Sequence, residues 1–401
     1  MKKKILFVIN TLGQAGAERA LITLLSYIDK NQYDVYLYVM LNQGELVDEV
    51  PGYVQILNHH ISPKSLHGKA GERELVKEVL TCGLRHGSGL RQIGSIVRNY
   101  KRMKQQDRVQ LDKLLWRTVA DGGKRFPMEF DLAIAYLEGA STYYVADYVL
   151  AKKKVAWVHV DVNEAGYTRE LDGDSYDKID HIYGVSHEVK DAFLTLHPEC
   201  KEKTSVIENI ISVEDIQKKS KEESSSEFDK NSFCLLTVGR LHQQKAYDVA
   251  IDAMKLVKEK RGDIKWYVVG DGPLKEELQK KIKDEDLENE FILLGHRKNP
   301  YPCYADCDIY IQATRFEGKS ISIREAKALG CPLIVSNVSG NREQIEDGKN
   351  GLLCELTKES IAEKILYLSD NEALRQQMSE MNRNEKDDHH LEELKKLFED
   401  I

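Results

Sequence analysis

The stretch that decides the fold covers residues 233–272 and reads FCLLTVGRLHQQKAYDVAIDAMKLVKEKRGDIKWYVVGDG. It opens on a continuous apolar run, passes through a polar turn into a helix predicted at about 247–260, and ends on a second apolar run. Continuous apolar strands that alternate with amphipathic helices are typical of a parallel sheet covered on both faces. Because the alternation continues through FILLG, CDIYIQAT and PLIVSN, the second half of the chain is predicted to be an α/β domain.

The first half of the chain repeats this alternation. An apolar strand at 5–9 leads through the glycine-bearing turn of NTLGQAGAERALITLLSYI into a helix, and YDVYLYVM, DLAIAY, KVAWVHV and HIYGVS supply further strands. A chain of 401 residues is longer than one hydrophobic core usually grows. We therefore expect two Rossmann-like domains, at 1–212 and 213–385, joined through the polar segment SVEDIQKKSKEESSSEFDKN, and a charged helix at 386–401.

Composition favours a folded protein in a reducing compartment. Charged residues make up 31% of the chain and hydrophobic residues 41%, a balance typical of soluble domains. No apolar stretch approaches the roughly 20 residues that cross a bilayer, and MKKKILFVIN turns polar too soon for a signal peptide. The 7 cysteines are odd in number and scattered, so we expect reduced thiols and a cytoplasmic protein.

A basic, helix-like insert at about 62–127 interrupts the first domain. From Lys64 to Arg125 the chain holds 15 Lys or Arg and 6 Asp or Glu, although its net charge is -8. Within 85–125, apolar residues lie among cations, which is typical of a helix on an anionic membrane; they are Leu90, Ile93, Ile96, Val97 and Tyr100 among Arg91, Arg98, Lys101 and Arg102. We expect peripheral membrane contact there, at the inner face of the cell membrane. The alternative is that the apolar residues pack on the first domain. Nucleic acid is not an expected partner, because aromatic residues for stacking are few.

Charged and small residues follow each strand of the second domain, where ligands of doubly wound sheets bind. Arg240 and Lys245 follow LLTVG, a turn with Gly272 follows WYVVG, His296 and Arg297 follow FILLG, and Glu317 follows IYIQAT. Residues 318–320 are expected to form the first turn of a helix that contains Glu325. Cations and backbone amides can bind a negatively charged diphosphate. Carboxylates beside an anion make sense only if they accept hydrogen bonds from hydroxyls. The pattern therefore predicts a nucleotide diphosphate sugar. Each piece alone has an ordinary alternative: Arg240 and Lys245 fit a solvated helix start, the turn with Gly272 is often only a turn, and Glu325 fits an exposed helix residue.

The segments VGRLHQQKAYDVAIDAM, VVGDGPLKEEL, FILLGH and FEGKSISIREAKALGCPLIVSN, in this order, resemble the second domain of retaining glycosyltransferases of family four. The resemblance implies the GT-B fold, in which two Rossmann-like domains face a central cleft and a C-terminal helix crosses back to the first domain. It implies that Arg240 and Lys245 bind the donor diphosphate. It also implies that Glu317 contacts the donor sugar and that Glu325 binds the ribose. The other implied donor-binding residues are Gly272, Leu294, Gly295, Gly318, Lys319, Ser320 and Ile321, with Leu294 and Gly295 framing the base.

Two segments of the first domain also resemble the family. The turn GQAGAERAL is similar to its Gly-Gly-Ala-Glu turn, which implies that Gly16 lies near the donor phosphate and that Gly13, Ala15 and Gly16 lie on the acceptor side. His159 in AWVHVD corresponds to a histidine near the reacting sugar, which implies a catalytic role shared with Glu317, Arg240 and Lys245. Ala15 and Ala246 replace glycines of the family, and these changes are tolerable where the backbone has negative φ.

The resemblance implies transfer of a sugar from a nucleotide sugar, UDP-linked in our interpretation, to a glycan or lipid-linked acceptor in bacterial surface polysaccharide or glycolipid biosynthesis. Retention at the anomeric carbon without a metal or other cofactor is expected. Asp306 and Asp308, and Asp172 and Asp174, resemble an Asp-x-Asp metal motif, but the first pair precedes a strand instead of ending one. The alternatives are a catalytically silent partner subunit, a nucleotide-sugar epimerase and a phosphorylase that requires a pyridoxal phosphate lysine.

Overall fold

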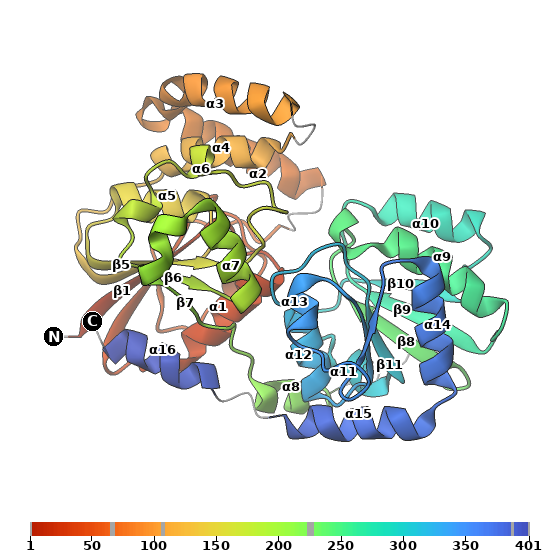
Figure 1. Ribbon diagram of the computed structural model, residues 1–401. Coiled ribbons are helices and arrows are strands. Elements are labelled where there is room, and N and C mark those ends of the chain that lie inside the picture. Colours follow the sequence, from red (N-terminus) through yellow and green to blue (C-terminus); the bar gives the residue numbers. More distant parts are fainter. Residues whose placement is uncertain (1, 65–68, 106–108, 223–227, 386–388, 400–401) are drawn as a thin grey trace. The chain divides into compact units, whose positions relative to one another are not determined.

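A computed structural model describes residues 2–64, 69–105, 109–222, 228–385 and 389–399. Its contacts divide the chain into two units (Figure 1). Unit 1 comprises Met1–Ile210 and Asp388–Ile401, and unit 2 comprises Ile211–Asp387. Each unit contains one parallel sheet, so the prediction of two parallel-sheet domains is confirmed. None of the described helices is long and apolar enough to cross a membrane.

Unit 1 is built on a seven-stranded sheet with the order β3-β2-β1-β4-β5-β6-β7, in which every pairing is parallel. The strands are β1 (Lys3–Ile9), β2 (Tyr33–Val39), β3 (Gln55–Ile56), β4 (Phe130–Ala135), β5 (Ala151–Val158), β6 (His181–Gly184) and β7 (Thr204–Val206). The central strands β1 and β4 are almost entirely buried, which explains why their sequences are continuous apolar runs.

Helices cover this sheet, and the last of them, α16, follows unit 2 in the sequence. They are α1 (Gly16–Tyr27), α5 (Ala140–Tyr148), α6 (Arg169–Asp172), α7 (His187–Leu196) and α16 (His389–Glu399). Leu394, Leu397 and Phe398 of α16 are buried in the core of unit 1, and the Tyr33 hydroxyl donates to the Phe398 carbonyl at 2.9 Å. The expected return of the C-terminal helix to the first domain is therefore confirmed.

The described part of the basic insert, between β3 and β4, contains α-helices and the short helix η2 (Arg85–Gly87). The α-helices are α2 (Lys69–Leu84), α3 (Ser88–Gln105) and α4 (Leu111–Asp121). Helix α4 supplies Val119 and Ala120 to the core of unit 1, whereas α3 forms the outermost layer of this end of the unit (Figure 1).

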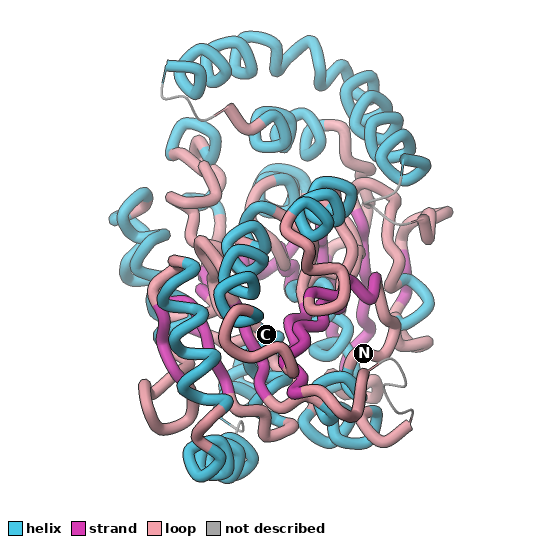
Figure 2. The backbone as a smooth tube through the Cα atoms, turned by 90° about the vertical axis from the view of Figure 1, so that its right-hand side faces the viewer, coloured by secondary structure: helices cyan, strands magenta, loops and turns pink. Residues whose placement is uncertain are grey.

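Unit 2 has a six-stranded parallel sheet with the order β10-β9-β8-β11-β12-β13. The strands are β8 (Phe233–Val238), β9 (Ile264–Val269), β10 (Phe291–Gly295), β11 (Ile309–Gln312), β12 (Leu333–Ser336) and β13 (Leu352–Cys354). The helices are α8 (Val213–Lys219), α9 (Tyr247–Lys258), α10 (Lys275–Asp284), α11 (Tyr301–Asp306), α12 (Ile321–Ala328), α13 (Ser339–Arg342), α14 (Lys358–Ser369) and α15 (Glu372–Asn384). Helices lie on both sides of the strands (Figure 2), and two separate apolar clusters fill the spaces between them and the sheet.

Candidate functional site

The loops that follow β8 and β11 are fastened to each other at the carboxyl edge of the unit 2 sheet. The side-chain amide of Gln244 donates to the Phe316 carbonyl at 2.9 Å, and the Arg315 amide donates to the Gln244 carbonyl at 2.8 Å. The Arg315 guanidinium also binds both carboxylate oxygens of Asp248, at 3.1 and 2.7 Å. Because β8 and β11 are paired neighbours, these contacts hold the two predicted phosphate-side loops as one surface.

Lys245 and Glu317 form the closest charged contact of this surface. Lys245 ends the short helix η5 (Gln243–Lys245), and its Nζ lies 2.5 Å from Oε2 of Glu317. Each side chain is only 15% exposed, so water screens this ion pair weakly. The structure thus brings together two residues that lie 72 positions apart and that were predicted to act on one ligand.

Gln312, the last residue of β11, connects Glu317 to the start of α12 and was not among the predicted site residues. Its Oε1 accepts hydrogen bonds from the Ser320 hydroxyl at 2.9 Å and from the Tyr310 hydroxyl at 3.1 Å, while its Nε2 lies 3.4 Å from Oε2 of Glu317. The residue is 1% exposed, in a strand that otherwise reads as apolar. A buried amide at the end of an apolar strand is the signal that would have identified it, because buried polar groups require partners.

Helix α12 begins later than predicted. Ser320 is its N-cap residue, with extended φ -71° and ψ 115°, and residues 318–320 form a bend before the first helical residue, Ile321. The prediction that 318–320 form the first turn is therefore wrong. The reason is the backbone conformation of Ser320, whose extended ψ cannot continue a helix. The bend also packs closely against α13: a Cβ at Gly340 would lie 1.9 Å from the Gly318 carbonyl oxygen, so only glycine fits there. Lys319 is half-buried in the same bend.

Glu325 lies inside α12 and is buried, which excludes the exposed-helix interpretation of this residue. Its Oε1 accepts from the Tyr301 hydroxyl at 3.0 Å, and its Oε2 accepts from the Tyr304 hydroxyl at 3.1 Å. Burial and the neighbouring Glu325 charge raise the pKa of Tyr304 well above its usual range, so the tyrosine remains a hydrogen-bond donor. The sequence analysis did not identify the two tyrosines, although they sit three residues apart on α11.

The remaining predicted donor residues lie at the same edge. Arg240 follows β8 and is exposed, and Leu294 and Gly295 end β10, where Gly295 has φ +77°. Gly272 in the turn after β9 allows the backbone to approach Leu241, because a Cβ there would lie 2.4 Å from the Leu241 carbonyl oxygen. The structure thus gives Gly272 a packing role between adjacent loops.

The two alanines that replace family glycines differ in backbone conformation. Ala15, the N-cap residue of α1, has φ -77°, a value that alanine adopts without strain. Ala246, between η5 and α9, has φ +45° and ψ 36°, in the left-handed region. Replacement of glycine by alanine was expected to be tolerable where φ is negative. This condition holds at Ala15 and fails at Ala246, where the left-handed conformation costs about 1–2 kcal/mol relative to glycine.

At the carboxyl edge of unit 1, β1 leads to Gly13, Ala15 and Gly16, and β5 leads to His159. His159 is 8% exposed, and burial lowers the pKa of its imidazole to about 3. The imidazole of His159 is hydrogen-bonded to the backbone of Tyr136, whereas its Nε2 is buried and has no partner among the described residues. His159 therefore presents a neutral ring nitrogen that can accept a hydrogen bond.

Glu138 lies beside His159 and was also missed. It follows β4, and its Oε2 accepts the backbone N–H of His159 at 2.9 Å. The Asn10 side chain binds the Glu138 carbonyl at 3.3 Å and accepts the Ser141 amide at 2.8 Å, which ties the ends of β1 and β4 together. Burial raises the pKa of Glu138 above its usual range. The sequence AYLEG, with a glutamate just after an apolar strand, could have indicated this residue.

The Asp-x-Asp pairs have structural partners. Asp308 lies at the amino end of β11, where its carboxylate accepts the Cys234 amide at 2.7 Å. Asp172 is buried and binds the Tyr143 hydroxyl at 2.7 Å and His197 at 3.0 Å. Among the described residues, no group of three or more His, Cys, Asp or Glu side chains is arranged to hold a metal ion.

Three bacterial glycosyltransferases show sequence similarity to parts of this chain. Poly(ribitol-phosphate) alpha-N-acetylglucosaminyltransferase of Staphylococcus aureus is 31% identical over 139 residues, which are 34% of this chain and 28% of that protein. N-acetylgalactosamine-N,N'-diacetylbacillosaminyl-diphospho-undecaprenol 4-alpha-N-acetylgalactosaminyltransferase of Campylobacter jejuni is 35% identical over 159 residues, 39% and 42% of the two chains. UDP-Gal:alpha-D-GlcNAc-diphosphoundecaprenol alpha-1,3-galactosyltransferase of Escherichia coli is 31% identical over 180 residues, 43% and 46% of the two chains. The matches thus span less than half of each relative's own length.

Solved structures share the fold. HepE of Anabaena superposes with a TM-score of 0.68 at 15% identity, covering 100% of this chain and 99% of that one. TarM of S. aureus superposes with a TM-score of 0.56 at 21% identity, covering 67% and 54% of the two chains. The family profile described as Glycosyl transferases group 1 matches residues 183–385, which include every predicted donor-site residue of unit 2. This chain belongs to the glycosyl transferases group 1 family.

Proposed function

We propose that this protein is a retaining glycosyltransferase that moves a sugar from a nucleotide diphosphate sugar to a glycan or lipid-linked acceptor. The observation that carries the proposal is the cluster at the carboxyl edge of unit 2, where Lys245 contacts Glu317 at 2.5 Å beside the N-terminus of α12. Cations and backbone amides at one such edge suit a diphosphate. A carboxylate that is already paired with a lysine can still accept a sugar hydroxyl through its second oxygen.

The proposed donor is UDP-linked. The E. coli relative is named for transfer from UDP-Gal, and HepE, which shares the fold, has been crystallised with UDP and with UDP-glucose. In our proposal Arg240 and Lys245 bind the diphosphate, together with backbone groups at 318–320. Glu325, held by Tyr301 and Tyr304 in α11, would accept the ribose hydroxyls.

The proposed acceptor is a glycan or a lipid-linked saccharide of a bacterial surface polymer. The S. aureus relative is named for poly(ribitol-phosphate), and the C. jejuni and E. coli relatives are named for diphospho-undecaprenol substrates. The uncharged imidazole of His159, whose Nε2 has no hydrogen-bond partner in the described part of the chain, suits a hydroxyl more than it suits a phosphate. We therefore assign His159 to a hydroxyl of the reacting sugars.

The proposed reaction exchanges one glycosidic bond for another with retention. The acceptor hydroxyl forms a bond to the anomeric carbon on the face that the diphosphate leaves, while the bond from that carbon to the diphosphate oxygen breaks. The acceptor proton passes to the departing phosphate oxygen, so charge builds on the diphosphate until the proton arrives. Fixed cations stabilise this developing charge, and one such donor is typically worth about 3 kcal/mol.

Product stereochemistry and chelation test the two finer parts of the mechanism. Retention requires that the anomeric configuration of the product, measured by NMR, equal that of the donor. Metal independence requires that the rate survive treatment with a chelator. Inversion at the anomeric carbon would refute the first part. Loss of turnover that magnesium or manganese restores would refute the second.

The activity itself is tested by incubating the purified chain with a panel of UDP-sugars without acceptor. Slow release of UDP from one sugar is the expected result, because water can replace the acceptor. No hydrolysis of any member together with no UDP binding would favour the silent partner subunit instead. Conversion of one UDP-sugar into another would indicate the epimerase.

Two glutamate variants separate the proposed sugar and ribose contacts. Glu317→Gln is expected to reduce sugar transfer while UDP binding changes little, because the sugar is the group that Glu317 contacts. Glu325→Gln is expected to weaken UDP binding by about tenfold, since hydrogen bonds to a charged group contribute about 1.5–3 kcal/mol. Equal UDP affinities in the two variants, measured by calorimetry, would break the assignment.

A further inference from the structure

Helices α2 and α3 of unit 1 expose large apolar side chains. We call this set the outer face; it consists of Val76, Leu80 and Leu84 of α2 and Leu90, Ile93, Val97 and Tyr100 of α3. Leu84 is 84% exposed and Leu90 is 80% exposed, values that are unusual for leucine in a folded domain. Steps of three and four residues place the members of each helix on one stripe. Their exposure excludes the alternative that these residues pack on the first domain, although Ile96 of α3 is half-buried.

Most of the apolar stripe of α3 faces away from the rest of unit 1. The side of α3 that faces the unit is largely polar: Ser88 and Asn99 are buried, and the Gln92 side chain donates to Asp121 at 2.7 Å. Its buried apolar contact is made by Met103, which packs with Leu114 and Leu171. A cavity of about 420 Å³ lies beside this side of the helix and is lined largely by polar and charged groups, including Arg117 and Asp121. A helix of a globular domain normally buries its apolar stripe and exposes its polar one. The stripe of α3 therefore does not serve the packing of unit 1.

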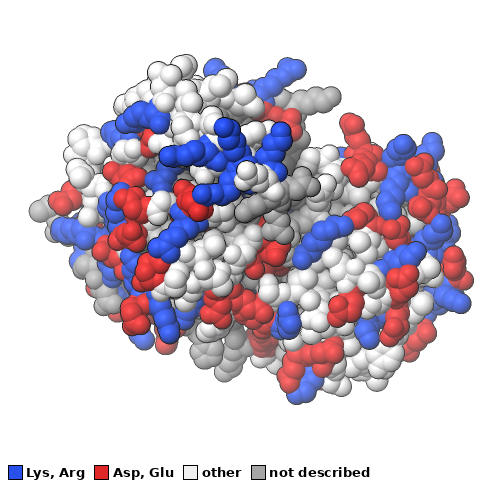
Figure 3. Space-filling model, turned by 45° about the horizontal axis from the view of Figure 1, so that its top comes forward, with Lys and Arg blue, Asp and Glu red and all other residues white. Residues whose placement is uncertain are grey.

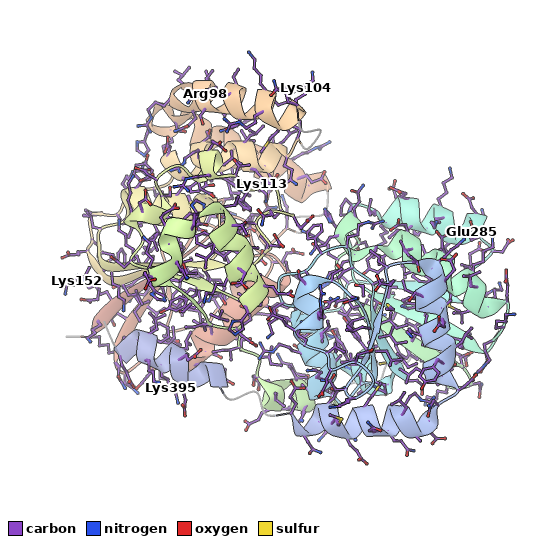
Figure 4. All side chains as sticks on the ribbon, in the orientation of Figure 1. Arg98, Lys104, Lys113, Lys152, Glu285 and Lys395 are labelled. Carbon is purple, nitrogen blue, oxygen red and sulfur yellow. The ribbon has the colours of Figure 1, made fainter. Side chains whose placement is uncertain are left out.

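The charge of α3 is entirely positive. The helix contains Arg91, Arg98, Lys101, Arg102 and Lys104 and no Asp or Glu. Arg102 binds Glu170 at 2.7 Å, whereas Arg98, Lys101 and Lys104 make no ion pair with other described residues. Figure 4 labels Arg98 and Lys104 on this outermost helix, and Figure 3 shows blue side chains beside white atoms at this end of unit 1.

We propose that the outer face of α2 and α3 is a docking surface for an anionic lipid bilayer. Aliphatic side chains fit the boundary between headgroups and acyl chains, and neighbouring cations fit anionic headgroups. Helix α3 carries both exposed apolar residues and cations, and it has no acidic residue that would repel anionic headgroups. Exposed apolar patches of this kind mark interaction sites. The proposal concerns a surface outside the donor and acceptor residues and does not depend on which sugar is transferred.

Vesicle sedimentation of the full chain without substrates tests this proposal. We expect binding to phosphatidylcholine vesicles that contain phosphatidylglycerol, at least about tenfold weaker binding to pure phosphatidylcholine, and weakening by added salt. Failure to sediment with the anionic vesicles at low salt would overturn the proposal. Because no sugar donor is present, this result is independent of the proposed catalytic activity.

Surface variants locate the contact. The double variant Leu90→Ser with Val97→Ser is expected to weaken vesicle binding by about tenfold or more, because each lost side chain removes apolar area from the interface. The variant Arg98→Gln with Lys101→Gln is expected to weaken binding only to anionic vesicles, on the order of tenfold. All four side chains are exposed, so the thermal unfolding midpoint should not change.

A matched control distinguishes this face from general stickiness. Leu150 lies just before β5, also in unit 1, and is 62% exposed. Leu150→Ser should leave vesicle binding unchanged, and an equal loss in this variant would overturn the assignment to α2 and α3. A protein that forms dimers in sedimentation velocity, and dissociates when Leu90 and Val97 are replaced, would show that a second copy covers the face and would also overturn the proposal.

Discussion

The two units place a Glu-Gly pair at the same topological position, yet they give it different electrostatic surroundings. In unit 1, Glu138 and Gly139 follow β4, which pairs with β1, the first strand of that unit in the sequence. In unit 2, Glu317 and Gly318 follow β11, which pairs with the first strand of that unit, β8. Glu317 lies 2.5 Å from a lysine, whereas Glu138 has a raised pKa because of its burial and binds a backbone amide.

From this difference we infer that topology determines where a ligand could bind in each unit and that local charge determines which kind of ligand would bind. At the unit 2 edge, Lys245 contacts the glutamate, and a cation at this position suits a diphosphate. The unit 1 edge combines Glu138 with His159, whose pKa of about 3 keeps the imidazole neutral at physiological pH. A neutral imidazole that can accept a hydrogen bond suits a sugar hydroxyl. We therefore assign charge stabilisation to unit 2 and hydroxyl recognition to unit 1.

The largest expected effect comes from the unit 2 cations. Lys245→Gln or Arg240→Gln should lower kcat/KM by on the order of a hundredfold, because each removes about 3 kcal/mol of charge stabilisation in the transition state. Steady-state kinetics with a saturating acceptor would measure this loss. Lys255→Gln is the matched control, because Lys255 is an exposed lysine of α9 that pairs with Glu285. If the control loses as much activity as the other two variants, unit 2 has no special cation site.

His159 should make the folded protein sensitive to acid. Its pKa is about 3 in the folded chain and ordinarily 6.5, so between these values the unfolded chain binds a proton that the folded chain does not. The free energy of unfolding should therefore fall with falling pH by up to about 1.4 kcal/mol per unit in this range. Glu138 acts in the opposite sense above its ordinary value of 4.5, because its pKa is raised.

Urea unfolding at several pH values, with His159→Gln beside the wild-type protein, isolates this contribution. The variant retains Glu138, so the difference between the two proteins should come from the imidazole. The variant should lose less stability than the wild-type protein between pH 6.5 and 4.5. Parallel curves over that range would mean that His159 is protonated in the folded chain.

Gln312→Leu should reduce kcat by about tenfold. The leucine would fill the buried site without binding Glu317 or Ser320, so both residues would lose a positioning partner. Gln312→Glu should be more harmful, because a second carboxylate would face Glu317. Comparison of kcat with the UDP dissociation constant separates this role from a structural one. A lower melting temperature with unchanged kcat would leave Gln312 as a packing residue only.

The smallest effect is expected at Ala246. Ala246→Gly should raise the free energy of unfolding by up to about 1 kcal/mol, because glycine adopts φ +45° without strain and offsets the loss of one buried methyl. Ala15→Gly is the control: φ is -77° there, so glycine should give no gain. Denaturant midpoints of the two variants would measure the contrast. A gain at Ala15 that equals the gain at Ala246 would contradict the strain argument.

The sequence predicted the parts of the fold that depend on local periodicity. The strands around Ile5, Trp266 and Tyr310 are continuous apolar runs, and these runs were sufficient to predict two parallel sheets. The start of α12 was misplaced because Ser320 has an extended backbone, in a bend that packs against Gly340, 20 or more residues further along the chain. The spacing of apolar residues within one segment does not reveal such contacts between distant segments.

The same distinction applies to the candidate site. Arg240, Lys245 and Glu317 could be predicted because they follow strands and match a known family pattern. The pKa shift of Glu138 and the hydrogen bonds of Gln312 could not, because they depend on burial and on partners from other strands. The left-handed backbone of Ala246 was equally hidden, since an alanine gives no sign of positive φ.

Titration of UDP into three proteins tests whether unit 2 binds the diphosphate while unit 1 binds sugar hydroxyls. Isothermal calorimetry would compare the wild-type chain with Lys245→Gln in unit 2 and His159→Gln in unit 1. We expect that UDP binds the wild-type chain, that Lys245→Gln weakens binding by about tenfold or more, and that His159→Gln changes it by less than about twofold. Equal losses in the two variants, or no binding of UDP to the wild-type chain, would contradict this expectation.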